Sequence, residues 1–293
     1  MLYTLLTTAL TATALVQQID STIPVERGQR LEVNAFAGEV AVTAWSRNAV
    51  RVQGEFTGRT RVEIGRAGST VEVRTQGRRG PAGGVELTIS VPAWMPLDVI
   101  GVHTDIGITG ARGPVAVETV QGDVTVEGGD GLVSLQSVDG QVALRGAKGR
   151  IEVNSVNEDI LIESSTGDIT AETVNGEILL RGVAATGLAA STVNGDIAYD
   201  GPIRNGGRYS LSSHNGDLTL TMAEAANAAV TVSTFNGEFE SEFPVTLTEA
   251  RKGRRLSFTL GSGSAQVSLE SFQGSIQLVR PGSRRVEQDH DHE

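Results

Sequence analysis

Apolar and polar residues alternate along most of this chain in short runs that recur at a nearly fixed period. In the octet Thr173-Val174-Asn175-Gly176-Glu177-Ile178-Leu179-Leu180, an Asn-Gly pair separates two such runs. Aligning the copies on this glycine, here called the anchor, gives Gly122, Gly140, Glu158 (where Gly is expected), Gly176, Gly195, Gly216, Gly237 and Gly274. The steps between anchors are 18, 18, 18, 19, 21, 21 and 37 residues, the last being interpreted as two rungs with one degenerate. Such a period predicts a solenoid.

The columns of this alignment predict how each rung folds. Apolar residues occupy the positions seven and five before the anchor and two and four after it, while a hydroxyl residue stands three before it. Period-two alternation on both sides of a turn indicates strand, turn, strand, turn in every rung. The pattern therefore predicts Val174, Ile178 and Leu180 inside, with Asn175 and Glu177 at a turn.

The fold class predicted by these columns is all-β, a single-stranded parallel β-solenoid with rungs of about 18–21 residues, similar to a β-helix or β-roll and right-handed. Asn-Gly between apolar runs is also typical of a β-hairpin, but the uniform period favours stacking in register. Asn and Gly both tolerate positive φ, and stacked amides can bond to the copies above and below. The expected structural turn ladder comprises Asn157, Asn175, Gly176, Asn194, Gly195, Asn215, Gly216, Asn236 and Gly237.

Four segments are expected along the chain. Residues 1–14 are uncharged, apolar with threonine, and end in Ala-Thr-Ala, which predicts a cleaved secretory signal peptide. Residues 15–100 are expected to form β-rich N-terminal coils and a cap, because an uncapped solenoid end is an open strand edge. Regular repeats should occupy 101–280, and residues 281–293 should form a disordered acidic and histidine-containing tail. No later segment has the apolar length of a membrane span.

Charge and composition narrow the function. Residues 114–243 contain 19 acidic and 6 basic residues, so nucleic acid is not expected as a partner. Aromatic residues make up 4% of the chain and cysteine is absent, which suits a thin solenoid filled by Val, Ile, Leu and Ala.

Only weak metal candidates are present, and no cofactor is expected. One is the column of acids directly after the anchor, which includes Asp196 and Asp217; stacked like charges would cost stability unless screened. We interpret them as solvated turn residues, because one carboxylate per rung converges poorly on calcium. His290 and His292 in the tail could hold a divalent metal weakly. No catalytic triad, phosphate loop or HExxH sequence occurs, so an enzyme is not expected.

Three stretches carry a resemblance to a known family: the opening ERGQRLEVNAFAGEVAVTAW, the segment ELTISVPAWMPLDVIGVHTDIGITG, and the repeated TVNGEI and TVNGDI. In these the chain resembles the bacterial "putative adhesin" β-strand-repeat family of unknown function, over most of its length. The resemblance implies an exported β-solenoid of the cell envelope, periplasmic or secreted, that binds an envelope or surface ligand, protein or glycan. A regulatory partner in envelope-stress signalling and a glycan-active β-helix enzyme are the alternatives.

Overall fold

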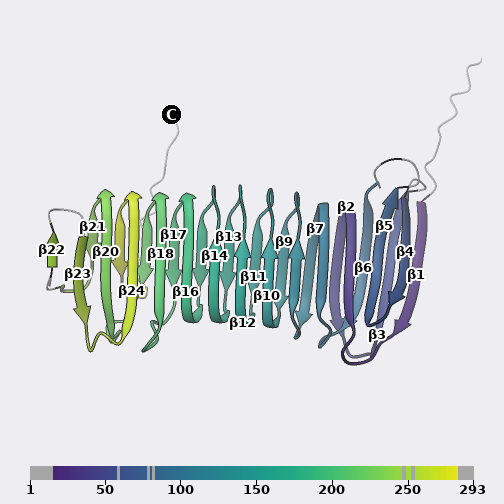
Figure 1. Cartoon of the computed structure of the whole chain (residues 1–293), viewed down its shortest axis with the longest axis horizontal. Coiled ribbons are helices and arrows are strands. Elements are labelled where there is room, and N and C mark those ends of the chain that lie inside the picture. The colour runs from purple at the N-terminus through teal and green to yellow at the C-terminus, as the bar shows by residue number, and fades with distance from the viewer. Residues whose placement is uncertain are drawn as a thin grey trace, which may run out of the picture.

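The computed structural model describes residues 16–57, 60–77, 80, 83–245, 249–251 and 255–282, and every regular element in this part is a β-strand. The expected signal segment and residues 283–293 of the expected tail lie outside it. The strands stack along one long axis into an elongated body (Figure 1). Pairing between successive rungs is parallel and in register, so the chain is a parallel β-solenoid. The right-handed sense of the coil stays a prediction.

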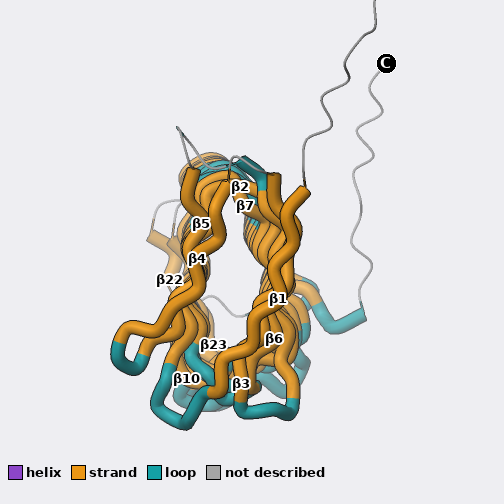
Figure 2. The backbone as a smooth tube through the Cα atoms, turned by 90° about the vertical axis from the view of Figure 1, so that its right-hand side faces the viewer, coloured by secondary structure: helices purple, strands orange, loops and turns teal. Residues whose placement is uncertain are grey.

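Two sheets face each other across the core, as the end-on view shows (Figure 2). In spatial order, the first sheet consists of β4 (Thr60–Ala67), β5 (Thr70–Gly77), β2 (Arg30–Trp45), β7 (Leu97–Ala111), β8 (Val115–Glu118), β10 (Asp130–Gln136), β12 (Lys148–Asn154), β14 (Thr166–Glu172), β16 (Ala184–Asn194), β18 (Arg208–Asn215), β24 (Ala265–Gln273), β20 (Ala228–Asn236), β23 (Arg255–Leu260) and β22 (Glu249–Arg251).

The second sheet repeats this order with the other half of each rung. It consists of β1 (Val16–Pro24), β3 (Ala49–Thr57), β6 (Val85–Pro92), the second halves of β2 and β7, β9 (Val124–Gly128), β11 (Val142–Arg145), β13 (Ile160–Glu163), β15 (Ile178–Arg181), β17 (Ile197–Asp200), β19 (Leu218–Thr221), β25 (Ile276–Val279) and β21 (Phe239–Ser241). β2 and β7 each run through both sheets and thereby join them at one corner of the coil, at the top of Figure 2.

The core between the sheets is built by the apolar columns that the alternation predicts. Ile178 and Leu180 are both fully buried, and each stacks directly on the equivalent residues of the rungs on either side. Because a single rung cannot enclose its apolar row, this stacking of like on like supplies the burial that holds the coil together.

Rungs do not follow one another in space as they do in sequence, and this corrects the interpretation of the 37-residue step. β24 lies between β18 and β20, so that the last rung of the chain is inserted between two earlier ones (Figure 1). The anchors therefore stack in the order Gly216, Gly274, Gly237. At the other end β2 is likewise inserted between β6 and β7 (Figure 1).

Antiparallel strands, rather than a degenerate rung, account for the long step. β23 pairs with the outer edge of β20, and β22 pairs with β23, both antiparallel. At the opposite end β1 and β4 are also antiparallel to their neighbours. Because an antiparallel strand breaks the parallel register, these strands close the stack to a further rung of the regular type. The division of the chain at residue 100 stays a prediction.

Candidate functional site

The most regular surface of the molecule is the line along which the chain passes from the first sheet to the second. We call this line the corner and define it as the six residues from four before the anchor to one after it. In spatial order its ten segments are 34–39, 100–105, 118–123, 136–141, 154–159, 172–177, 191–196, 212–217, 270–275 and 233–238.

Thr104 and Glu158 stand at two of the ten anchors and glycine at the other eight. At the glycine anchors described next, the neighbouring rung occupies the place of a side chain. A Cβ built on Gly195 would lie 2.0 Å from the carbonyl oxygen of Gly176, and one on Gly216 would lie 1.9 Å from that of Gly195. Gly237 would meet the carbonyl of Gly274 in the same way, at 2.0 Å. The close approach of consecutive backbones thus selects the residue.

Hydroxyl side chains three residues before the anchor are buried and tie each corner to the next. Ser213 Oγ donates to the Gly195 carbonyl and Ser271 Oγ to the Gly216 carbonyl, both at 2.9 Å. Ser155 Oγ is the exception, since it is the one buried side-chain polar atom without a hydrogen-bond partner among the described residues. These bonds satisfy carbonyl groups that the turn removes from the strand ladder.

The asparagines proposed from sequence as part of a turn ladder lie in one column, directly before the anchor, and the glycines of that ladder are the anchors themselves. Nδ2 of Asn175 donates to Oδ1 of Asn157 at 3.2 Å, and Nδ2 of Asn194 donates to Oδ1 of Asn175 at 2.8 Å. Asn215 continues the line by donating to Asn194 at 2.8 Å. Asn236 shares the column, but its neighbour in space is Gln273. The inserted last rung therefore interrupts the run of asparagines.

The acidic column after the anchor bonds to backbone. Oδ1 of Asp196 accepts the backbone N–H of Asp217 at 2.7 Å, and Oδ1 of Asp217 accepts that of Ser275 at 2.6 Å. Asp105 and Asp123 accept the equivalent N–H groups of the following rungs, each at 2.9 Å. Such charge-assisted bonds give these acids a structural role. No three His, Asp or Glu side chains converge for a metal within the described ranges; His290 and His292 fall outside them.

Two residues before the anchor, the structure corrects the sequence prediction. Val174 is 41% exposed rather than inside. Its parity explains the error: positions seven, five and three before the anchor face inward, so the position two before it must face outward. In this column Phe36 and Val102 are half-buried. Its exposed members, in spatial order, are Val120, Val138, Val156, Val174, Val193, His214, Phe272 and Phe235. We call these eight residues the apolar stripe.

Ring stacking at one end of the apolar stripe follows the spatial order of the rungs. His214 stacks on Phe272, and Phe272 stacks on Phe235, with 4.7 Å between ring centroids in both pairs. His103 lies in the asparagine column and contacts Phe36 edge-on, with 5.8 Å between the ring centroids. The apolar stripe was missed from sequence because valine next to Asn-Gly was interpreted as core.

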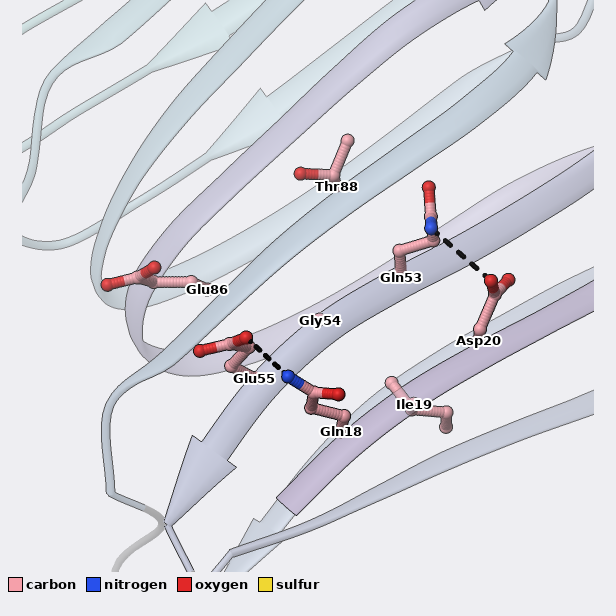
Figure 3. Close-up of a pocket in the computed structure, with 8 residues that line it drawn as sticks. All are labelled: Gln18, Ile19, Asp20, Gln53, Gly54, Glu55, Glu86 and Thr88. Atoms are coloured by element: carbon pink, nitrogen blue, oxygen red, sulfur yellow. Dashed lines mark hydrogen bonds between the residues drawn. The ribbon is translucent and has the colours of Figure 1, made fainter. Parts of the chain in front are cut away.

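An open depression of about 560 Å³ lies elsewhere, on the outer face of β1, β3 and β6 (Figure 3). Gln18 donates to Glu55 at 2.8 Å within it, and Gln53 donates to Asp20 at 3.3 Å. Hydrogen bonds from the Arg51 guanidinium, at 2.6 and 2.9 Å, hold the pKa of the Asp20 carboxyl below its usual value. Asp20 is thus ionised at neutral pH and unsuited to donate a proton.

The side chains that line the depression include no pairing of a nucleophile with a general base of the kind used in covalent catalysis. Its lining contains no histidine, cysteine or lysine, and its remaining acids, Glu55 and Glu86, stand opposite each other on adjacent strands. A second, smaller groove of about 110 Å³ crosses β9, β11 and β13. Neither hollow has a histidine, cysteine or lysine in its lining.

The chain is similar to one known protein family and, more distantly, to several solved structures. Residues 28–279 match the family described as Toastrack DUF4097. Among solved structures, a "putative adhesin" from Bacteroides fragilis is 10% identical with a TM-score of 0.46, over 90% of this chain and 97% of that one. A "putative adhesin" from Parabacteroides merdae is 11% identical with a TM-score of 0.36, over 90% and 96%. These structures are too distant to inform on a ligand. No curated protein matches the chain.

Proposed function

The chain belongs to the Toastrack DUF4097 family, and we propose that it is an exported, non-catalytic binding scaffold of the bacterial cell envelope. The observation that carries this proposal is the corner, where ten stacked rungs present the same kinds of side chain along one line. A surface of this kind offers many equivalent contacts and no single reacting centre. It suits adhesion to, or display of, an extended partner.

Two features of the acidic side chains support a scaffold over an enzyme. Five aspartates of the acidic column, Asp196 and Asp217 among them, accept backbone N–H groups of the neighbouring rung. In the depression on β1, β3 and β6, an ionised Asp20 is paired with Arg51. In the described part of the chain no helix is both long enough and apolar enough to cross a membrane. Export is proposed from the apolar, uncharged segment 1–14.

Affinity capture from envelope extracts tests the proposal, with the chain immobilised through a tag placed after residue 293. Recovery of wall or surface material, protein or glycan, is the expected result. Recovery of one defined membrane protein would instead favour the regulatory role in envelope-stress signalling. In parallel, turnover of any member of a polysaccharide panel would contradict the non-catalytic assignment, provided that repeated purification did not remove the activity.

A further inference from the structure

The apolar stripe is an unusual feature for a soluble surface. Its seven large hydrophobic members are between 37% and 46% exposed, and together with His214 they stand in a continuous row. Single exposed apolar residues are ordinary, whereas a continuous row marks a surface that contacts another molecule. None of these seven residues belongs to the buried core cluster, which the inward-facing columns form.

The charges around the apolar stripe are of one sign only. Across the sixty residues of the corner there are thirteen acids and no lysine or arginine: Glu39, Asp105, Glu118, Asp123, Asp139, Glu158, Asp159, Glu172, Glu177, Asp196, Asp217, Glu238 and Glu270. Glu118 and Glu172 flank the apolar stripe on one side and the acidic column flanks it on the other. A second copy of this chain placed stripe against stripe would bring these acids together, which electrostatics disfavours.

The spacing of the apolar stripe discriminates between partner conformations. Successive members are separated by one rung, about 4.8 Å, in agreement with the 4.7 Å ring stacking of His214, Phe272 and Phe235. Along an extended strand, side chains on one face recur only every 6.6 Å or so. Along an α-helix, residues three and four apart recur at about 4.5 and 6.0 Å, which brackets the rung spacing. A helix parallel to the long axis can therefore keep an apolar residue over nearly every rung.

We propose that the corner binds a cationic amphipathic α-helix of a partner protein, with its apolar face on the apolar stripe and its lysines or arginines over the flanking acids. This deepens the proposed function and rests on it, because it names the partner chemistry for the scaffold's corner. Eight members of the apolar stripe span about 34 Å, which corresponds to a helix of about 22 residues.

The test uses residues 15–293 of the chain and a synthetic peptide of about 22 residues with leucines at helical i, i+3, i+4 and i+7 spacing and lysines elsewhere. Two control peptides replace the lysines by glutamate or the leucines by serine. Fluorescence anisotropy is expected to show saturable binding of the Leu/Lys peptide, weakened by added salt. Both control peptides should bind at least about tenfold more weakly. Equal binding of the Ser/Lys peptide would reduce the site to non-specific charge attraction and overturn the proposal.

Matched variants locate the site. The triple variant Val120→Thr/Val138→Thr/Val156→Thr keeps shape and β-propensity at exposed positions, and should weaken Leu/Lys binding by at least about tenfold without changing the thermal melt. The control Leu161→Thr/Leu179→Thr alters the partly exposed outer face of the second sheet and should bind like the parent. Equal losses in both variants would overturn the corner as the site.

Two other occupants have distinct signatures. A dimer of the parent chain that the triple variant abolishes would show that the stripe joins two copies. Loss of polysaccharide binding in the triple variant, with peptide binding unchanged, would assign the stripe to glycans. Either result contradicts the helix proposal while leaving the scaffold function standing. If the parent chain retains envelope material in affinity capture yet fails to bind the peptide, the helix proposal alone fails.

Discussion

Replacing Gly216 by alanine should be among the most damaging single-methyl changes in the chain. The added Cβ would lie 1.9 Å from the carbonyl oxygen of Gly195, whereas real contacts of this kind are not found below 3.0 Å. The backbone of Gly216 is outside the left-handed region, so alanine adopts its conformation without strain and the contact is the only cost. The opposing atom is backbone, which cannot rotate away.

The magnitude follows from the bonds that the displacement would break. Moving the Gly195 and Gly216 rungs apart by about 1.1 Å stretches three bonds of 2.9 to 3.0 Å beyond hydrogen-bond range: Gly195 N–H to Asn215 O, Ile197 N–H to Asp217 O, and Ser213 Oγ to Gly195 O. At about 0.5–1.5 kcal/mol for each bond, the expected loss is about 2–4 kcal/mol.

Urea unfolding of Gly216→Ala beside Gly107→Ala measures this loss. Gly107 lies in β7 with no heavy atom within 4 Å of its built Cβ and no positive φ, so its alanine variant should match or slightly exceed the parent in stability. Equal midpoints for the two variants would refute the argument that backbone approach selects glycine at the anchor.

Three further outcomes are expected. Ser155→Ala should leave the free energy of unfolding in urea unchanged or raise it, because Ser155 Oγ is buried without a partner. Ser213→Ala should lower the free energy of unfolding by about 1 kcal/mol, because it removes the bond from Ser213 Oγ to the Gly195 carbonyl. Equal effects of the two variants would contradict this. Asp196→Ala should lower the thermal midpoint through loss of its bond to the Asp217 N–H, and Asp196→Asn much less. Millimolar calcium and EDTA should give coincident melts, since a calcium-dependent rise would indicate a cation site. Burial raises the pKa of Tyr199 above its usual value, so its stabilising effect is complete below about pH 10 and declines as pH rises further; Tyr199→Phe should lessen that alkaline decline in denaturation curves.

The sequence predicted the coil because its apolar columns have period two and recur at a fixed interval. Ile178 and Leu180 could be placed inside, since stacking in register is the only arrangement that buries every copy. Val174 was misplaced because an apolar residue beside Asn-Gly was assigned to the core. Side chains alternate between the two faces of a strand, and Thr173, the preceding residue, is buried, so the side chain of Val174 must face outward.

Rung order could not be obtained from periodicity. All the rungs present the same columns of apolar and polar residues. The sequence pattern therefore allows β24 to lie either beyond β20 or between β20 and β18. What distinguishes the two arrangements is the antiparallel pair β22 and β23, because β23 pairs with β20 and occupies its outer edge. Such edge pairing depends on contacts distant in sequence, which alternation does not encode.

The corner and the apolar stripe both depend on the order in which the rungs stack in space. Engineered cysteine pairs measure this order directly, because the chain contains no native cysteine. His214 and Phe272 occupy adjacent rungs, with rings 4.7 Å apart, whereas Phe235 lies one rung further. A disulfide requires Cα atoms within about 7 Å, which one rung permits and two rungs, about 9.6 Å, forbid. On mild oxidation His214→Cys/Phe272→Cys should form an intramolecular disulfide and His214→Cys/Phe235→Cys should not. The opposite result would show that the rungs follow sequence order and would contradict the account.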